Sequence, residues 1–387
     1  MSELILEFAI TNANLRNLFL FDYFCNLNRR KYGTMKTDKI KIGITQGDMN
    51  GTGCEIIIKA LSDNRITEEY TPVIFGSPKV MAFYRKALNV QNFNINSINS
   101  AKEADSRKIN LVNCIDDNVR VEPGKPVDES VNDALLCLES AIDALNQGDI
   151  DVLVTMPFSN IKGGNNNFPG HTEYLRLAWG AEDSMVIMSS DILKVAVLTG
   201  NLPLSEVPAN ITQEKILSKI QLLDNTMLQD FGIRRARIAV LSLNPYTNAD
   251  TLTGKEEEMA LIPAIEKARQ EGLLAFGPYS ADDFFGSDKF KHFDIILAMY
   301  NDQGLIPFKT LVYDSGANYT AGLPFVRTSP VHDVGYNIAG KGEASADSFR
   351  TAIYTAVDIY RNRAGYKSLI ENKMPETKER LETARIV

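Results

Sequence analysis

Histidine and cysteine, which often hold metals or form disulfides, are scarce in this 387-residue sequence, with three of the first and four of the second. The cysteines are Cys25, Cys54, Cys114 and Cys137, and their spacing forms neither a C-x-x-C pair nor a zinc-binding module. This spacing argues against a structural zinc site and a disulfide framework. We expect reduced thiols in a cytoplasmic protein.

A long apolar segment and an excess of positive charge are also absent. No apolar run approaches the ~18 residues that a membrane-spanning helix requires, so we expect no membrane partner. The sequence has 41 Lys and Arg residues against 49 Asp and Glu residues, a net charge of −8. This charge repels phosphate backbones and argues against nucleic acid as a partner, but it leaves room for one local cationic pocket.

The rest of the composition is that of an ordinary globular protein, with 44% hydrophobic and 23% charged residues. The length predicts about two domains. Residues 1–34 place an aromatic stretch before a basic end, the reverse of the order in a secretory signal. We expect these residues to be an extension outside the core, translated from an upstream start codon, because Met35 opens a natural first strand.

From Met35 onward, short apolar runs alternate with amphipathic stretches. The apolar runs predict strands covered on both faces, at residues 39–45, 72–76, 110–114, 151–156, 185–188, 193–199, 237–243 and 294–299. Apolar residues spaced three and four apart predict helices at residues 128–146, 213–228, 256–271 and 346–362. This alternation predicts an α/β architecture with a mostly parallel sheet, in which two lobes share strands and enclose a cleft.

The G-x-G-x-x-G motif of common dinucleotide-binding folds is missing. Residues 47–55 read Gly-Asp-Met-Asn-Gly-Thr-Gly-Cys-Glu instead. Glycines before a helix can bring backbone amides close to an anion, but the carboxylates of Asp48 and Glu55 oppose this. The segment therefore favours glycines that form a turn and a helix cap, with a ligand loop as the alternative.

The three histidines differ in context. His171 and Thr172 follow a Pro-Gly turn and begin a predicted helix, where an imidazole and a hydroxyl can donate hydrogen bonds to a phosphate or carboxylate. Thr172 and Glu173 equally suit a helix-capping box, and both interpretations stay open at this point. His292 lies in a charged segment and is predicted to be exposed. His332 lies in a loop without a clear role.

A further polar cluster, residues 300–303, follows the predicted strand at 294–299. The carboxyl ends of strands are where α/β proteins place ligand-binding groups. Lys309, Asn318 and Arg327 come next in the chain, and this combination suits an anion clamp, because Arg grips a phosphate with two donors and Lys adds charge. The alternative is that both cations lie on the surface in solvent.

Together these segments resemble the 4-hydroxythreonine-4-phosphate dehydrogenase family of vitamin B6 biosynthesis, from about Lys39 to about Ile353. Four family blocks occur in the family's order: the glycine loop with substitutions at 47–55, Gly-His-Thr-Glu at 170–173, Tyr-His-Asp-Gln-Gly-Leu with one change at 300–305, and Gly-Leu-Pro-x-x-Arg-Thr-Ser at 322–329. Several blocks in one order make the resemblance specific.

The resemblance implies a two-lobed α/β/α fold like that of isocitrate and isopropylmalate dehydrogenases. In that fold the active site lies in the interdomain cleft, the protein is a homodimer, and NAD binds without the usual glycine motif. We accordingly expect one lobe at residues 35–160 with 320–387 and a second lobe at residues 161–319.

The resemblance also implies roles for single residues. A phosphorylated small-molecule substrate would be bound by His171, Thr172, Lys309, Asn318 and Arg327. The three histidines that bind a divalent metal in the family correspond here to Asn201, Tyr246 and Asn301. Amide and phenol oxygens are poor ligands for transition metals, so we expect no metal site of the family type and at most a weak site for an ion such as Mg²⁺.

The family reaction implies NAD or NADP as hydride acceptor, oxidation of 4-hydroxythreonine 4-phosphate or a related phosphorylated hydroxy acid, and decarboxylation. In place of a metal, Asn201, Tyr246 and Asn301 could donate hydrogen bonds to the developing oxyanion, at about 3 kcal/mol per donor. With Asp302, these are the catalytic candidates. The sequence identifies neither cofactor-binding residues nor a general base. A catalytically impaired phospho-ligand binding protein and an acyl-phosphate transferase remain as other functions.

Overall fold

The computed structural model describes residues 39–372, apart from Asn64, Asp117, residues 160–169, residues 246–253 and Asp314. The predicted extension at residues 1–34 and the candidate Tyr246 therefore lie outside the described residues.

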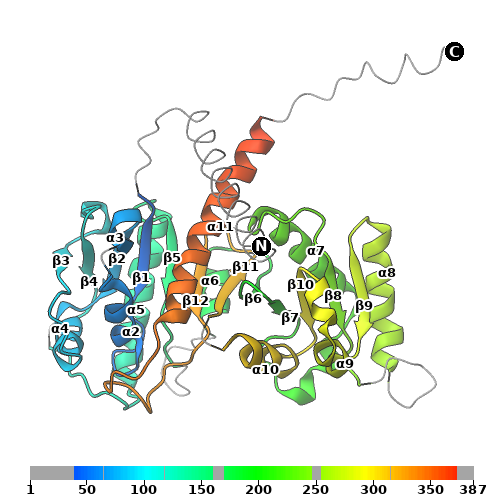
Figure 1. The fold of residues 1–387 in the computed structure, drawn as a ribbon, viewed down its shortest axis with the longest axis horizontal. Helices are drawn as coiled ribbons and strands as arrows, with labels where there is room; N and C mark the ends of the chain where they lie inside the picture. The colour runs from blue at the N-terminus through cyan, green and yellow to red at the C-terminus, as the bar shows by residue number, and fades with distance from the viewer. Residues whose placement is uncertain are drawn as a thin grey trace, which may run out of the picture. The chain divides into compact units, whose positions relative to one another are not determined.

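One twelve-stranded sheet runs through the described residues. Its strands are β1 (Lys41–Thr45), β2 (Thr71–Gly76), β3 (Ile95–Ile98), β4 (Ile109–Asn113), β5 (Val152–Thr155), β6 (Met185–Ser189), β7 (Lys194–Val197), β8 (Ile238–Leu241), β9 (Ala275–Tyr279), β10 (Ile295–Ala298), β11 (Ala317–Ala321) and β12 (Arg327–Pro330). Their order across the sheet is β3-β4-β2-β1-β5-β12-β11-β6-β7-β10-β8-β9 (Figure 1). All eight predicted strands are present; β3, β9, β11 and β12 were not among them.

The prediction of a mostly parallel sheet is confirmed. Eight strand pairings are parallel, and the three antiparallel ones join β12, β11, β6 and β7 in the middle. Because the direction reverses three times there, the parallel strands on the two sides of this centre run in opposite directions. Helices connect the parallel strands, as such connections require.

The helices lie between the strands in the sequence. They are α2 (Gly53–Leu61), α3 (Arg65–Glu69), α4 (Pro78–Ala87), α5 (Asp128–Asn146), α6 (His171–Ala178), α7 (Gln213–Gln229), α8 (Ile262–Gln270), α9 (Ala281–Gly286), α10 (Asn301–Val312) and α11 (Asp347–Glu371). The bounds of α5 are those predicted. The helix predicted at residues 256–271 instead begins as a π-helical turn, Glu257–Leu261, and continues as α8.

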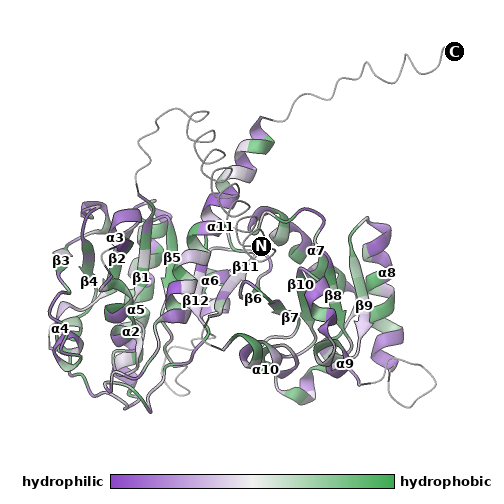
Figure 2. Cartoon of the chain, in the orientation of Figure 1, coloured by the Kyte–Doolittle hydropathy of each residue, from purple (hydrophilic) through white to green (hydrophobic). Residues whose placement is uncertain are grey.

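The strands form the core because most of them are apolar on both faces. β2, β5, β8 and β10 are buried along their whole length, as expected for strands between two helical layers. Figure 2 shows hydrophobic strands flanked by helices that carry hydrophilic residues. Cys54, Cys114 and Cys137 are free thiols. Within the described residues, no helix is both long and apolar enough to cross a bilayer.

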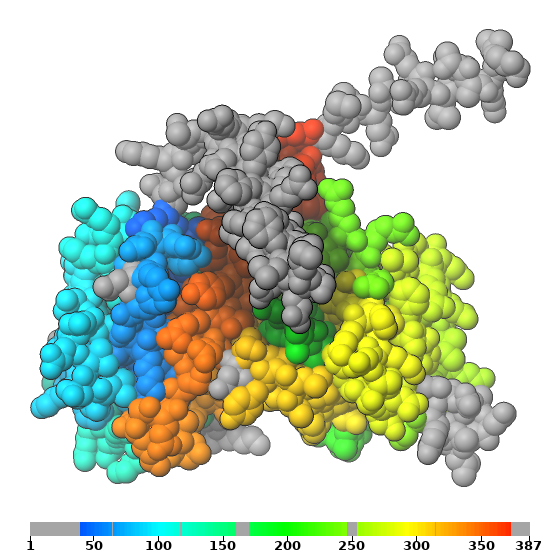
Figure 3. Space-filling model, in the orientation of Figure 1, coloured from blue at the N-terminus to red at the C-terminus, as the bar shows by residue number. Residues whose placement is uncertain are grey.

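The long helix α11 packs against one face of the central strands. The Thr328 hydroxyl of β12 donates a hydrogen bond of 2.8 Å to the carbonyl of Ala352 in α11. On the same face of β11, the Tyr319 hydroxyl donates to Asp230, just after α7, at 2.5 Å. Figure 3 shows α11, in orange to red, and α10, in gold, at the surface on the side viewed. The opposite face of the central strands is thereby left to form a site.

Candidate active site

The central strands present a row of polar side chains on the face that points away from α11. Asn318 of β11 pairs with Ser329 of β12, and directly paired residues project to the same face of a sheet. Arg327 lies two residues before Ser329 and therefore shares this face. Tyr319 and Thr328, which are paired with each other, point the other way.

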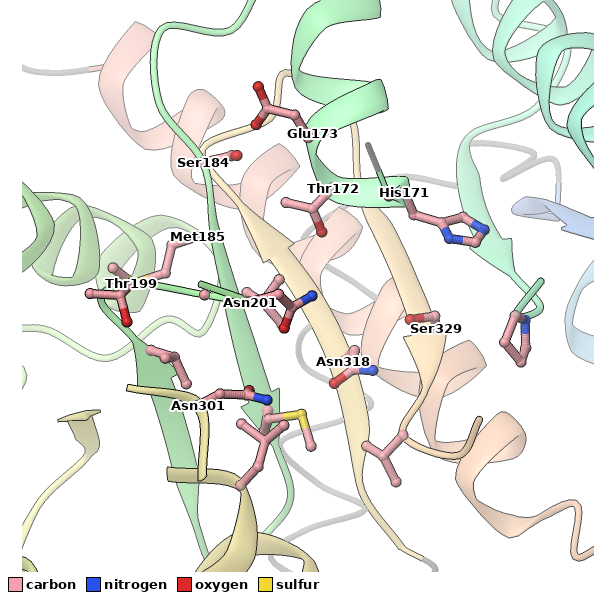
Figure 4. Close-up of a pocket in the computed structure, with 18 of the residues that line it drawn as sticks. His171, Thr172, Glu173, Ser184, Met185, Thr199, Asn201, Asn301, Asn318 and Ser329 are labelled. Carbon is pink, nitrogen blue, oxygen red and sulfur yellow. The ribbon is translucent and has the colours of Figure 1, made fainter. Parts of the chain in front are cut away.

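A cavity of about 770 Å³ lies over this polar row. Such a volume falls within the roughly 300–1,000 Å³ typical of small-molecule sites. Figure 4 shows side chains from several elements around the cavity. Among the residues that line it are Thr155, His171, Thr172, Glu173, Ser184, Thr199, Asn201, Lys215, Lys219, Asn301, Lys309, Asn318, Arg327, Ser329 and His332. The five predicted substrate-binding residues are thus brought together from four elements.

Arg327 is a buried cation, with a relative exposure of 5%. Its Nε and Nη2 donate to the Thr155 hydroxyl at 3.0 and 2.5 Å, and its Nη1 donates to the Thr320 hydroxyl at 3.1 Å. Within the described part of the chain, no carboxylate pairs with it. Burial lowers the pKa of the guanidinium to about 10. A desolvated cation without a counter-ion is unfavourable by itself. An anion that binds in the cavity would therefore compensate the charge of Arg327.

His171 is the first residue of α6, which begins here because Gly170 adopts a φ of 107° that favours glycine. Burial, and then the charge of Arg327, hold the pKa of His171 well below its usual range, so the ring is neutral at pH 7. The capping-box alternative is wrong. No side chain caps the helix, and the Glu173 carboxylate pairs with Arg176 at 2.5 Å.

Lys309 and Asn318 complete the predicted clamp. Lys309 lies in α10, lines the cavity and forms no ion pair with any described residue. The Asn318 amide donates to the carbonyl of Pro330 at 3.0 Å. Its oxygen Oδ1 is buried and has no hydrogen-bond partner among the described residues, so it can accept a hydrogen bond from a ligand.

The positions that correspond to the family's metal ligands carry amides around the same cavity. Asn201 and Asn301 both line it, and Figure 4 shows them in its middle together with Asn318. The described residues contain no group of three or more His, Cys, Asp or Glu side chains that could hold a metal. Neutral amides without an imidazole, thiolate or carboxylate do not fit a transition metal.

Asp302 was a catalytic candidate, but its side chain is exposed and it does not line the cavity. It lies in the first turn of α10, where a carboxylate favours the positive end of the helix dipole.

The glycine loop at residues 47–55 is packed against protein and does not line the cavity. A Cβ on Gly53 would lie 2.4 Å from the carbonyl oxygen of Gln46. The Asp48 carboxylate accepts from the Tyr336 hydroxyl at 2.5 Å, and the Glu55 carboxylate accepts from the Gly340 amide at 3.0 Å. These contacts favour the turn-and-cap interpretation of the loop.

Several cavity residues were not found from the sequence, and three of them are Thr155, Lys215 and Lys219. Thr155, which orients Arg327, ends β5 and is the last but one residue of the strand predicted at 151–156, and its hydroxyl was a usable signal. Lys215 and Lys219 also line the cavity. They lie in an amphipathic helix, and its sequence pattern predicts that lysines face solvent, so it gave no signal for these two. His292, predicted to be exposed, is exposed.

The mixed sheet with a cavity that holds a buried cation at its centre defines an α/β protein whose site suits a small anionic ligand. The chain belongs to the family described as "Pyridoxal phosphate biosynthetic protein PdxA", whose sequence profile matches residues 68–356. It is 50% identical over 345 residues to the 4-hydroxythreonine-4-phosphate dehydrogenase of Bacteroides thetaiotaomicron, covering 88% of this chain and 94% of the relative.

Two further comparisons agree with this family. The 4-hydroxythreonine-4-phosphate dehydrogenase of Sulfurihydrogenibium sp. is 38% identical over 327 residues, which are 84% of this chain and 99% of the relative. The crystal structure of the enzyme of that name from Klebsiella pneumoniae superimposes with a TM-score of 0.72 at 30% identity, covering 83% of this chain and 99% of that chain. The predicted α/β fold is confirmed, and the chain belongs to a family of dehydrogenases.

Proposed function

We propose that this chain catalyses the NAD(P)-dependent oxidation of a phosphorylated hydroxy acid in vitamin B6 biosynthesis, with 4-hydroxythreonine 4-phosphate as the first candidate substrate. The observation that carries the proposal is the buried Arg327 guanidinium, which faces the cavity with hydroxyl partners and without a described carboxylate. Relatives that share up to half of the sequence bear the name of this activity.

The phosphate would bind at the Arg327 side of the cavity. The guanidinium supplies charge and directed donors, and Lys309 supplies a second positive charge. His171 lies at the N-terminus of α6, where the helix dipole favours an anion. Its ring is neutral before binding, so it would donate one hydrogen bond from a protonated nitrogen.

The oxidation moves a hydride from the carbinol carbon to the nicotinamide, and the hydroxyl proton leaves to solvent or to a base. NAD(P)⁺, when bound, accepts the hydride; we assign no cofactor-binding residues. The amide N–H groups of Asn201 and Asn301 would donate hydrogen bonds to the oxygen as it becomes a carbonyl. One such donor is typically worth about 3 kcal/mol in the transition state. The resulting 3-oxo acid then loses CO₂; the electron pair of the broken C–C bond passes to the ketone oxygen to form an enolate, which takes up a proton from solvent at carbon.

We derive no step through a divalent metal, because the donor set of the described residues does not fit one. A homodimer, a cytoplasmic location and the two lobes at residues 35–160 with 320–387 and 161–319 are part of the proposal. The family assignment favours a dehydrogenase over an acyl-phosphate transferase. A protein that binds phosphorylated ligands without turnover is the second candidate, favoured by amides at the family's metal-ligand positions.

The test is absorbance at 340 nm with 4-hydroxythreonine 4-phosphate and NAD⁺ or NADP⁺, with excess chelator or with added Mg²⁺ or Zn²⁺. We expect NAD(P)H formation that persists with chelator and is lost in an Arg327→Met variant. Turnover only after metal addition would show that the amides do not replace the metal. Thermal stabilisation by the substrate without any turnover would favour the binding protein.

A further inference from the structure

A second cationic group lies in the same cavity, away from Arg327. Lys215 and Lys219 stand one turn apart near the start of α7, and both line the cavity. The Lys219 ammonium donates to the Asp183 carboxylate and, at 2.9 Å, to the carbonyl of Ser184. The Lys215 ammonium lies 3.4 Å from the amide oxygen of Asn210 and forms no ion pair with any described residue.

The neighbouring carboxylates Asp183 and Glu173 each pair with another cation, so neither forms an ion pair with Lys215. Asp183 pairs with Lys219, and Glu173, the acidic residue of α6 that lines the cavity, pairs with Arg176. Burial, and then the charge of Lys219, lower the pKa of Lys215. Both effects disfavour an isolated ammonium here, the charge of Asp183 opposes them, and the charge of an anion bound beside Lys215 would offset them.

Arg327 and the two lysines of α7 lie near different strands of the cavity floor. Arg327 is on β12, whereas Ser184, which binds Lys219, directly precedes β6, and β11 lies between the two strands. Two strand spacings correspond to about 10 Å. Figure 4 shows the uncharged side chains of Thr172, Asn201 and Asn318 among the labelled residues around the cavity. The cavity therefore carries two separate cationic groups and has uncharged side chains in its neutral middle, while the acidic Glu173 and Asp333 also line it.

We propose that Lys215 binds the carboxylate of the substrate while Arg327 binds its phosphate, so that the cavity selects ligands with an anionic group at each end. The proposal rests on the proposed function and adds how the acid group is recognised. An ammonium suits a single carboxylate because it is a compact charge with three donors. The reacting hydroxyl would then lie in the neutral middle, near the amides of Asn201 and Asn301.

The test compares two ligands that differ in the carboxylate. 4-Hydroxythreonine 4-phosphate carries both anionic groups, and 2-amino-1,3,4-butanetriol 4-phosphate, in which a hydroxymethyl group replaces the carboxylate, carries only the phosphate. Affinities are measured by isothermal titration calorimetry on the full chain with chelator present. In Lys215→Met we expect the affinity for the first ligand to fall at least tenfold, about 1.4 kcal/mol, and that for the second to change less than twofold.

Two variants control for charge and for folding. Lys215→Arg keeps the positive charge and should retain the affinity for 4-hydroxythreonine 4-phosphate within about threefold. Lys267→Met removes an exposed lysine of α8 that does not line the cavity, and should change neither affinity. The backbone amide of Lys215, which donates to the helix-capping Thr212 hydroxyl, is kept in every variant.

The outcomes separate this proposal from the proposed function. Equal losses for both ligands in Lys215→Met, or no loss for either, would overturn the carboxylate role while leaving the phosphate site intact. If the unmodified chain binds neither ligand and Arg327→Met changes nothing, the proposed function itself fails. A selective loss for the carboxylate ligand, restored by Lys215→Arg, would establish the second anionic subsite.

Discussion

The guanidinium of Arg327 is held by the hydroxyl of Thr155, which accepts hydrogen bonds from both its Nε and its Nη2 although the two residues are 172 positions apart in the chain. The contact joins the start of β12 to the end of β5, two strands that pair in parallel. A neutral hydroxyl orients the cation without neutralising it. The full charge of Arg327 is therefore available to a ligand in the cavity.

Replacing Arg327 by Met should separate ligand binding from stability. We expect the affinity for 4-hydroxythreonine 4-phosphate to fall at least a hundredfold, since a charge-assisted contact with two donors is lost. The free energy of unfolding without ligand should stay equal or rise, because a buried cation without a described counter-ion is removed. Calorimetric titration and urea denaturation measure the two effects.

Thr155→Val is the matched control for that prediction. It leaves the guanidinium buried and removes the acceptor of two of its donors, so we expect the unfolding free energy to fall by about 1–3 kcal/mol. If Arg327→Met destabilised the ligand-free protein more than Thr155→Val, the guanidinium would be a structural group rather than a binding group.

His171 should make the protein less stable in mild acid. Burial holds its folded-state pKa well below the ordinary histidine pKa of about 6.5. Its neutral form is therefore favoured by folding, and this contribution is fully present above about pH 6.5 and is lost as the pH falls below it. We expect the free energy of unfolding to be lower at pH 5 than at pH 7.5.

Two variants test whether His171 causes that pH dependence of the unfolding free energy. His171→Asn should reduce the difference between pH 5 and pH 7.5, whereas His292→Asn, at an exposed position, should leave it unchanged. Urea denaturation at both pH values is the measurement. An identical difference in the two variants would contradict the role given to burial of His171.

Among the charged residues on the α11 side of the sheet, Asp230 should be one of those whose substitution lowers the unfolding free energy most. It is 3% exposed, accepts from the Tyr319 hydroxyl at 2.5 Å and pairs with Arg363 at 2.6 Å. Asp230→Asn leaves a largely buried Arg363 without its partner, which should cost about 3 kcal/mol in unfolding free energy. Asp288→Asn removes a surface pair with Lys291 and should have no measurable effect in the same denaturation experiment.

Two glycines with similar backbone angles, one in the glycine loop and one outside it, should differ in the stability that each loses on replacement by Ala. Gly47 has a φ of +68°, and a Cβ there would lie 2.7 Å from the carbonyl oxygen of Pro157. Gly148 has a φ of +74° and nothing within 4 Å of a Cβ. Ala should cost about 1–2 kcal/mol of backbone strain at both positions, with further steric cost at Gly47. Thermal unfolding should show the larger loss of stability for Gly47→Ala; equal losses would contradict the close packing of the loop.

Much of the site could be predicted from residues adjacent in the chain. His171 and Thr172 follow a Pro-Gly turn, and Lys309 follows the polar end of β10, so their positions depend on local signals. Arg327 was expected in the site, but its burial was not, since burial depends on the strands that flank it. Asp302 shares its block with Asn301, yet a helix turns neighbouring side chains in different directions.

The sequence by itself determined the alternation of strands and helices, the blocks that carry the proposed anion-binding residues, and the replacement of three imidazoles by two amides and a phenol. Hydrophobic periodicity and turn residues are local properties, so these features need no knowledge of distant contacts. Only the tertiary structure decided that the sheet reverses direction at its centre, that Thr155 holds Arg327, and that Lys215 faces the same cavity. These relationships depend on strand pairing and on which face each side chain takes, and long-range packing sets both.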